Sequence, residues 1–264
     1  MRPLEALAPE DGKRIEGLLF DLDDTFLSHG VLRRAAYEAL WDLHDAGFKL
    51  IVVTGRPALW GEWVVKQWPV DAATTENGAI AIVRDGERVA RVDPCDAAER
   101  GRRRERLEAL AAAVHARTPD VKPTQDRAGR ISDFTWDIGE YETVPPERVD
   151  LVASILGEHG ARSSRSSVHL HATYDADDKA SGTVRLLAAR FGVEAGAARF
   201  RFAFVGDSGN DRACFSAFET TFGVANVRRS IHALAVPPRY VARAEMGEGF
   251  AEVARALLRC KMGA

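Results

Sequence analysis

The fold is decided by the stretch Leu18-Leu19-Phe20-Asp21-Leu22-Asp23-Asp24-Thr25, in which a short apolar run leads into a group of carboxylates. An apolar run of this kind is typical of a strand buried on both faces of a parallel sheet. Ligands of such sheets bind beyond the carboxyl ends of the strands. Asp21 and Asp23 are therefore candidates for a nucleophile and for a proton donor and acceptor, although an acidic turn after a strand would look the same.

The segments that follow this strand alternate between helical and extended patterns. Apolar residues at three- and four-residue spacing predict a helix over about residues 31–46, and a buried strand follows at 49–53. Pro57 is predicted to be the first residue of the next helix. The same alternation returns late in the chain, with predicted helices near 184–191, 213–218 and 249–258 and predicted strands at 202–205 and 221–225. This order predicts an α/β fold with a doubly wound parallel sheet.

The middle of the chain has a different pattern. A hairpin is predicted over residues 80–92, followed by two helices at about 96–116 and 146–159 and by strands near 131–138 and 168–174. This mixture predicts an α+β domain inserted into the α/β core. We expect the core to comprise residues 1–82 and 178–264, and the inserted domain to comprise residues 83–177.

The composition excludes several classes of function. The 264 residues carry a net charge of −3, which gives no argument for binding nucleic acid or an anionic membrane. The basic run between Arg100 and Arg106 is interpreted as a solvated helix face. Three cysteines without a CxxC pair indicate a reducing compartment. No signal peptide or long apolar run is evident, so we expect a soluble, cytoplasmic protein.

Two more polar groups follow predicted strands, and a lysine precedes a predicted helix. The loop Gly206-Asp207-Ser208-Gly209-Asn210-Asp211 offers hard oxygen ligands of the kind that Mg²⁺ prefers, although it could equally cap the next helix. Thr54-Gly55-Arg56 offers a hydroxyl and backbone amides for phosphate oxygens. Lys179 could supply a positive charge. Together these groups form the set needed for phosphoryl transfer.

These motifs resemble those of the haloacid dehalogenase (HAD) superfamily, and in particular of its type IIB branch of Cof-like and sucrose-phosphate-phosphatase-like hydrolases. The match covers all four motifs in order: the DxDx[TV] motif at Asp21 to Thr25, the Thr/Ser motif at Thr54, the lysine at Lys179, and the GDSxND motif at Gly206 to Asp211. Two other segments are similar to this branch, namely Glu76-Asn77-Gly78-Ala79 and a tail that contains Gly223-Val224-Ala225-Asn226 and Gly247-Glu248-Gly249-Phe250.

The resemblance implies a role for each matching residue. Asp21 would form an aspartyl-phosphate, while Asp23 would protonate the leaving group and then activate water. Mg²⁺ would be bound by Asp21, by Asp23 through its backbone carbonyl, and by Asp207, with Asp211 and Asn210 in support. Thr54 and Lys179 would hold the phosphoryl group, and the insert would be a cap that closes over the substrate.

The sequence departs from the family pattern at two positions. Lys179 is followed by Ala180-Ser181-Gly182, where many relatives have Lys-Gly directly, so the local loop is expected to differ. Asp24 stands where many relatives have glycine, and we interpret it as a turn residue.

The substrate is expected to be a small phosphorylated metabolite. The core residues expected to bind it are Thr54, Gly55, Arg56, Asn77 and Lys179. Candidate contacts in the insert are Asp133, Asp137, and Ser163 to Ser167 with Arg165, His169 and His171. On a strand the two histidines would share a polar face, which would either bind sugar hydroxyls or face solvent. The leading hypothesis is a sugar or glycoside phosphatase, acting as a monomer or homodimer. A sugar phosphomutase and a non-enzymatic sugar-phosphate-binding protein are the alternatives.

Overall fold

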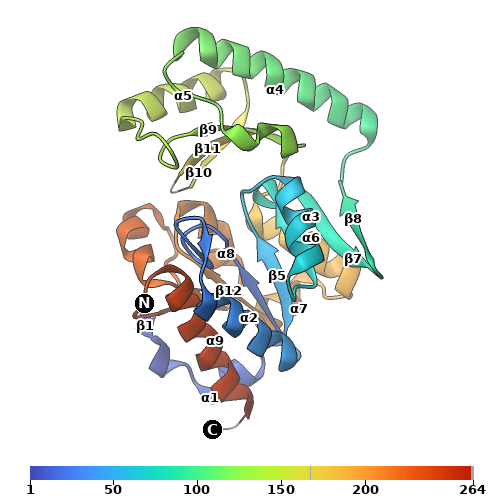
Figure 1. Ribbon diagram of the computed structural model, residues 1–264, viewed down its shortest axis with the longest axis vertical. Coiled ribbons are helices and arrows are strands. Elements are labelled where there is room, and N and C mark those ends of the chain that lie inside the picture. The colour runs from blue at the N-terminus through green and yellow to red at the C-terminus, as the bar shows by residue number, and fades with distance from the viewer. Residues whose placement is uncertain (167, 263–264) are drawn as a thin grey trace.

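The computed structural model describes residues 1–166 and 168–262 and contains a core with an inserted domain beside it (Figure 1). The core is built on a nine-stranded sheet in the order β1-β14-β13-β12-β2-β5-β6-β7-β8. These strands are β1 (Arg2–Pro3), β14 (Tyr240–Val241), β13 (Thr220–Gly223), β12 (Phe202–Gly206), β2 (Gly17–Phe20), β5 (Lys49–Val53), β6 (Ala72–Thr75), β7 (Ile80–Asp85) and β8 (Arg88–Val92).

The three central strands are parallel and end at the same edge of the sheet. Phe20 of β2 is paired with Val52 of β5 on one side and with Val205 of β12 on the other. All residues of β2 and β12 are buried, which explains their continuous apolar sequence. Because Asp21, Thr54 and Asp207 directly follow these strands, the register brings all three to one edge.

Helices cover both faces of the sheet, which confirms the doubly wound α/β fold. On one face, α2 (Arg34–Asp45), α3 (Ala58–Gln67) and α9 (Met246–Met262) share an apolar cluster with alternate residues of β2 and β5. On the other face, α6 (Lys179–Phe191), α7 (Ala195–Arg201) and α8 (Arg212–Ala217) pack in a second cluster with Leu19 and Ile51. The short helix α1 (Pro9–Lys13) contacts α9.

The inserted domain lies over the edge where the central strands end (Figure 1). Its antiparallel sheet has the order β10-β11-β9, formed by Arg162–Arg165, His169–Thr173 and Asp133–Asp137. The helices α4 (Ala97–Arg117) and α5 (Pro146–Glu158) pack on this sheet through a separate apolar cluster that includes Leu107, Val152 and Trp136.

The structure differs from the sequence predictions in several places. The hairpin β7–β8 belongs to the core sheet, so the boundary expected at residue 83 falls inside β7, because the hairpin pairs with β6 rather than with the insert. Residues 31–32 form β4 (Val31–Leu32), which pairs with β3 (Leu27–Ser28) in a small hairpin. The helix that was predicted to begin at residue 31 begins at Arg34. Pro57 caps α3 instead of being its first residue. Strand β10 and helix α7 carry no strong periodicity and were not predicted.

Within residues 1–166 and 168–262, no helix combines the length and the apolar character that crossing a membrane would require.

Candidate active site

Asp21 lies at the centre of a buried group of charged side chains. The ammonium of Lys179 donates to Oδ1 of Asp21 and to Oδ1 of Asp211, both at 2.7 Å. Oxygens of Asp21, Asp207 and Asp211 all lie within 4.8 Å of one another. The structure therefore brings together Asp21, Lys179, Asp207 and Asp211, which come from segments far apart in the chain.

The loop after β12 is organised by its own side chains. Oδ2 of Asp211 accepts from the backbone N–H groups of Asp207 and Ser208, at 2.9 and 3.1 Å. Asn210 accepts from the hydroxyl of Ser208 at 2.8 Å. Asp211 thus shapes the turn that presents Asp207, while its other oxygen is held by Lys179.

Asp207 is oriented by two residues to which the sequence motifs assigned no role. The hydroxyl of Thr25 donates to Oδ1 of Asp207 at 3.1 Å, and the amide of Asn226 donates to Oδ2 at 3.0 Å. The same amide donates to the carbonyl of Asp24, and Oδ1 of Asn226 accepts from the backbone of Met246. Asn226 therefore ties the Asp207 loop to the turn that carries Asp23, and only its place in the matching tail motif pointed to it.

The electrostatics of this group suit a divalent cation. Burial raises the pKa of Asp21 to about 8, with Asp211 and Asp23 adding to the shift and Lys179 opposing it. Burial, together with Asp211 and Asp21, also raises the pKa of Asp207 well above its usual range. Burial disfavours the ammonium of Lys179, but Asp21 and Asp211 outweigh this and raise its pKa. One lysine faces three carboxylates, so the oxygen donors fit a hard ion such as Mg²⁺.

Asp23 is held by an arginine rather than by the acidic group. Arg56 donates to it through Nε at 3.0 Å and through its terminal nitrogen at 2.6 Å. The terminal nitrogen of Arg56 is also 3.9 Å from Glu140 of the inserted domain, whose other oxygen is 2.8 Å from Nε2 of His169. Arg56 and His169, both predicted to bind substrate, thus lie in a chain of charges that links Asp23 to the insert.

Asp24 occupies a tight turn, as interpreted from the sequence. Its φ of 56° is left-handed, a conformation that aspartate tolerates better than most residues. Its side chain points toward His29 at 3.7 Å. Glycine would adopt this φ freely as well.

Thr54 and Gly55 lie between the acidic group and β11 of the insert. The hydroxyl of Thr54 accepts from the N–H of Arg56 at 3.1 Å, which fixes the turn. A Cβ on Gly55 would lie 3.0 Å from Cε1 of His171 and 3.2 Å from Oδ1 of Asn77. The absence of a side chain at Gly55 therefore lets the inserted domain approach the core.

The two histidines of β11 face the core rather than solvent, which rules out the solvent-facing interpretation. Both are buried, and Nδ1 of His171 is 2.9 Å from Asp133. Burial keeps the pKa of His171 well below its usual range, so its ring is neutral. Asp133 is held in turn by Arg130, and Asp137 accepts from three backbone amides of the next turn, so both aspartates are structural.

Asn77 combines a left-handed backbone with an unpaired acceptor. Its φ is 55°, and its Oδ1 is buried without a hydrogen-bond donor among the described residues. Asn77 also lines the cavity beside Lys179.

The position of Lys179 depends on a glycine contact. The backbone of Gly78, with a φ of 97°, lies directly against the first turn of α6, and a Cβ on Gly182 would be 2.0 Å from the carbonyl oxygen of Gly78. Any side chain at Gly182 would push the helix away and move Lys179 with it. In the segment Ala180-Ser181-Gly182, the close contact with Gly78 therefore falls at Gly182, three residues after Lys179.

A cavity of about 740 Å³ opens beside Lys179, between the insert and the core. Arg165 lines it from β10, as do Ser163, Ser164 and Ser166. Ser167 lies outside the described residues. The predicted contacts of the insert are thus divided: Arg165 reaches the cavity, whereas His169 is engaged with Glu140.

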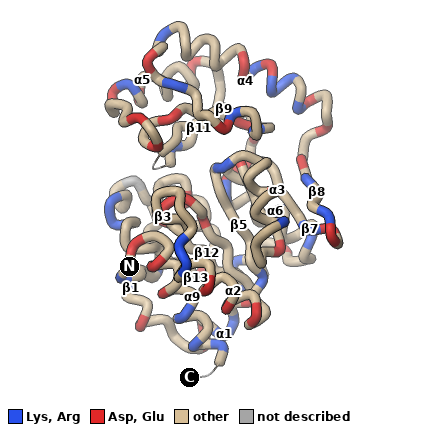
Figure 2. Tube along the Cα trace, in the orientation of Figure 1, with Lys and Arg blue, Asp and Glu red and all other residues tan. Residues whose placement is uncertain are grey.

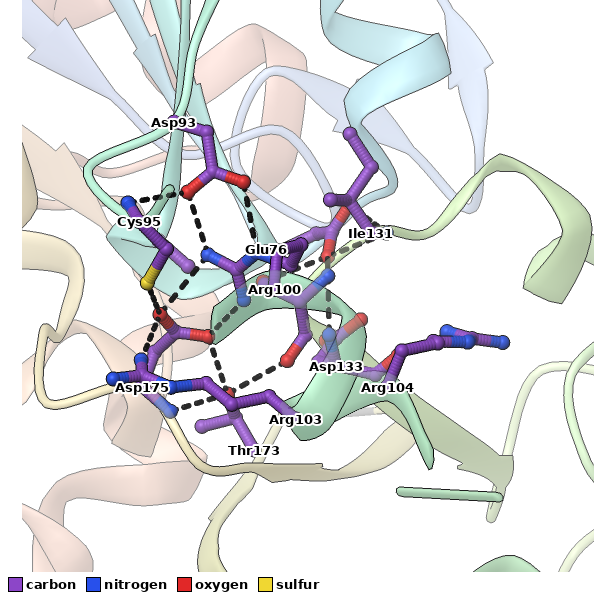
Figure 3. A network of polar contacts seen from close by, with 12 residues as sticks. Glu76, Asp93, Cys95, Arg100, Arg103, Arg104, Ile131, Asp133, Thr173 and Asp175 are labelled. Atoms are coloured by element: carbon purple, nitrogen blue, oxygen red, sulfur yellow. Dashed lines mark hydrogen bonds and ion pairs between the residues drawn. The ribbon is translucent and has the colours of Figure 1, made fainter. Parts of the chain in front are cut away.

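Two polar networks hold the insert at its junction with the core (Figure 3). Glu76 accepts from the backbone amides of Ile131, Ser132 and Asp133 and from that of Ala58. In the second network, Arg100 joins Asp93, which follows β8, to Asp175, which follows β11, and Arg103 also donates to Asp175. The two chain segments that connect the insert to the core are therefore braced against each other.

Comparison with known proteins agrees with this fold. Residues 18–97 match the family model of haloacid dehalogenase-like hydrolases. Among solved structures, a Thermoplasma acidophilum protein superposes with a TM-score of 0.70 at 16% identity, covering 92% of this chain and 98% of the other. The sucrose-phosphatase of Synechocystis, solved with sucrose and phosphate, gives 0.65 at 18%, covering 92% and 98%. A HAD subclass IIB sugar phosphatase gives 0.62 at 18%, covering 94% and 99%.

No curated protein matches the chain significantly in sequence. The fold and the edge-of-sheet site define an α/β protein with an inserted domain over a buried carboxylate group. The chain has the haloacid dehalogenase-like fold, and the resemblance inferred from its four motifs is confirmed.

Proposed function

We propose that the protein is a Mg²⁺-dependent phosphatase that hydrolyses a small phosphomonoester, a sugar or glycoside phosphate in the first instance, through an aspartyl-phosphate on Asp21. The observation that carries the proposal is the convergence of Asp21, Lys179, Asp207 and Asp211 at one buried edge of the sheet. Several of the solved structures with this fold are named as phosphatases.

Each of these residues has a task that follows from its contacts. An ionised Asp21 would attack phosphorus, and the P–O bond to the leaving group would break as the new bond forms. Lys179 neutralises Asp21 and lies at the cavity floor, where it would also meet the phosphoryl oxygens. The hydroxyl of Thr54 and the amides of its turn would hold those oxygens. When bound, Mg²⁺ would neutralise charge on the nucleophile and on the phosphoryl group.

Asp23 would deliver a proton to the departing oxygen and later take one from the water that hydrolyses the aspartyl-phosphate. In the structure, the guanidinium of Arg56 donates hydrogen bonds to both carboxylate oxygens of Asp23. Donation of a proton would therefore require Arg56 to shift, and the contact of Arg56 with Glu140 supports coupling of that shift to the position of the insert. The insert would act as a cap that covers the substrate.

The test is a phosphate-release assay over phosphorylated metabolites with Mg²⁺, run beside Asp21→Asn. We expect stoichiometric free phosphate from at least one substrate and none above background from the variant. A phosphomutase would instead give an isomerised product and depend on a bisphosphate primer. Absence of release from every substrate would contradict the proposed activity, and full activity in Asp21→Asn would contradict the assigned nucleophile.

A further inference from the structure

The cavity beside Lys179 is where a leaving group would lie if the proposed function holds. Its walls come from β10 and α5 of the insert and from the core segments η4 (Gly209–Asp211), α8 and η5 (Ala225–Ala233). Its volume of about 740 Å³ is that of a site for a small metabolite. Strand β10 contacts η4, so the two walls meet close to the Asp207 loop.

Most charged groups that line this cavity are already engaged. Lys179 is held between Asp21 and Asp211. The carboxylate of Asp178 caps α6 by accepting from the amides of Ala180 and Ser181. The guanidinium of Arg162 donates to the backbone carbonyls that follow β11. Lys179 is thus assigned to the reacting phosphoryl group, and Asp178 and Arg162 already have hydrogen-bond partners within the chain.

Two arginines of the lining remain without a carboxylate partner in the part of the chain that is described. Arg165 extends from β10 of the insert, and Arg212 stands at the first turn of α8 in the core. By contrast, the arginines at the junction, Arg56, Arg100 and Arg130, are all ion-paired. The lining has two carboxylates, Asp150 of α5 and Asp178. It has four cationic side chains, Arg162, Arg165, Lys179 and Arg212, so the wall is positive.

We infer that the leaving group of the substrate carries a second anionic group, a carboxylate or a second phosphate, which binds between Arg165 and Arg212. This inference rests on the proposed phosphatase function and narrows its substrate class. Guanidinium groups bind carboxylate and phosphate oxygens through paired, charge-assisted hydrogen bonds. Because one arginine belongs to the insert and the other to the core, an anion between them would also hold the two walls together. Hydroxyls of Ser163, Ser164 and Ser166 are available for neutral parts of the same ligand.

Paired substrates that differ only in the second anion test this inference. In the carboxylate arm of the experiment, phosphoglycerate is compared with glycerol phosphate that carries its phosphate on the equivalent carbon. Fructose bisphosphate is compared with fructose monophosphate, which is the phosphate arm. We expect kcat/KM to favour the doubly anionic member of at least one pair by about ten-fold or more, mainly through KM. The arm that shows the preference identifies the chemistry of the anion.

The variants Arg165→Ala and Arg212→Ala, and the double variant, connect that preference to the two arginines. Each single change is expected to reduce the preference by about five- to ten-fold, and the double variant should treat both members of the pair alike. Arg88→Ala is the matched control, because Arg88 is an exposed arginine on β8 outside the cavity. That variant should retain the wild-type preference.

Two results would overturn the inference alone: equal kcat/KM for both members of each pair in the wild type, or a preference that survives in the double variant. In either case Asp21-dependent hydrolysis of p-nitrophenyl phosphate would leave the proposed function in place. If no phosphomonoester is hydrolysed, the proposed function fails, and the inference fails with it.

Discussion

The carboxylates at the sheet edge and those at the junction of the insert are balanced differently. At the sheet edge, Asp21, Asp207 and Asp211 lie together, and Lys179 forms ion pairs with Asp21 and Asp211. At the junction of the insert, Asp93 and Asp175 are matched by Arg100 and Arg103 (Figure 3). The first group is buried and has an excess of negative charge, whereas the second is partly exposed at Asp93 and has no such excess.

The difference distinguishes a group of carboxylates that can bind a cation from a group that only connects two segments of the chain. Burial of an uncompensated carboxylate is costly, so the pKa of Asp21 and of Asp207 is raised. At the junction, burial opposes ionisation of Asp93, but Arg100 outweighs it and lowers the pKa of Asp93. A cluster that lacks cations can recruit one, whereas a balanced cluster only holds segments together.

The largest expected effect is on turnover and comes from the sheet-edge group. Asp21→Asn removes the nucleophile and should lower kcat by about a thousand-fold or more, because the covalent step is lost. Asp24→Asn is the matched control, since asparagine tolerates the left-handed φ of 56° at that turn. Phosphate release under single-turnover conditions measures both. Comparable losses in the two variants would contradict the distinct role of Asp21.

Removing an arginine from the charge-balanced group at the junction should lower the free energy of unfolding instead of turnover. Arg100→Ala leaves Asp175 buried with a weaker set of partners, and the free energy of unfolding should fall by about 3 kcal/mol. Arg102→Ala removes an exposed arginine of the same helix, paired with Glu99, and should cost less than about 1 kcal/mol. Urea unfolding measures both values. Equal losses would show that the junction network does not brace the insert.

Mg²⁺ should stabilise the folded protein by binding to the carboxylates at the sheet edge and not to those at the junction. At a hundred times its Kd, the ion should raise the free energy of unfolding by about 2.7 kcal/mol. The gain should be absent in Asp207→Asn and retained in Arg100→Ala, whose starting stability is lower. Thermal unfolding with EDTA or with added Mg²⁺ measures this, and an unchanged gain in Asp207→Asn would place the ion elsewhere.

The most gradual expected effect is the dependence of stability on pH. The pKa of Asp21 is about 8 in the folded protein and near 3.8 when unfolded, so between these values the folded state holds more protons. Stability of the metal-free protein should therefore fall as pH rises through this window, by at most about 1.4 kcal/mol per pH unit from this residue. Burial raises the pKa of Glu76 to about 7, which acts in the same direction.

Asp21→Asn should make this decline shallower, whereas Asp93→Asn should not. The pKa of Asp93 is lowered, so its contribution has the opposite sign and is lost as pH falls below the range of a free carboxyl. Urea unfolding in EDTA across about pH 5 to 8 tests both, over the upper part of the expected window. A decline of the same slope in Asp21→Asn would contradict the raised pKa.

The sequence predicted the core and its motif residues because their signals are local. The apolar run of β2 and the polar residues that follow β2, β5 and β12 are each visible within a few positions. Parallel pairing then places Asp21, Thr54 and Asp207 at one edge without further information.

The remaining features depend on contacts between distant segments. Asn226 donates a hydrogen bond to Asp207, and Glu76 accepts hydrogen bonds from the backbone amides of residues 131–133. The sequence near Asn226 and Glu76 does not indicate which distant residue each one contacts. The basic run of α4 reads as a solvated face, and Figure 2 shows acidic and basic residues interspersed along it, but Arg100 turns inward to the junction. Strand β10 was missed because its serines and arginines lack alternation; it is an edge strand with a mostly exposed face.

The ion pairs between Asp93, Arg100 and Asp175 affect how the insert can evolve. They hold the entry and exit of the insert side by side, so the insert is attached to the core at one place. A domain joined in this way can be lengthened, shortened or exchanged without altering the register of β2, β5 and β12. Selection can then act on the insert, and on the ligands that it admits, while the chemistry at the sheet edge is inherited intact.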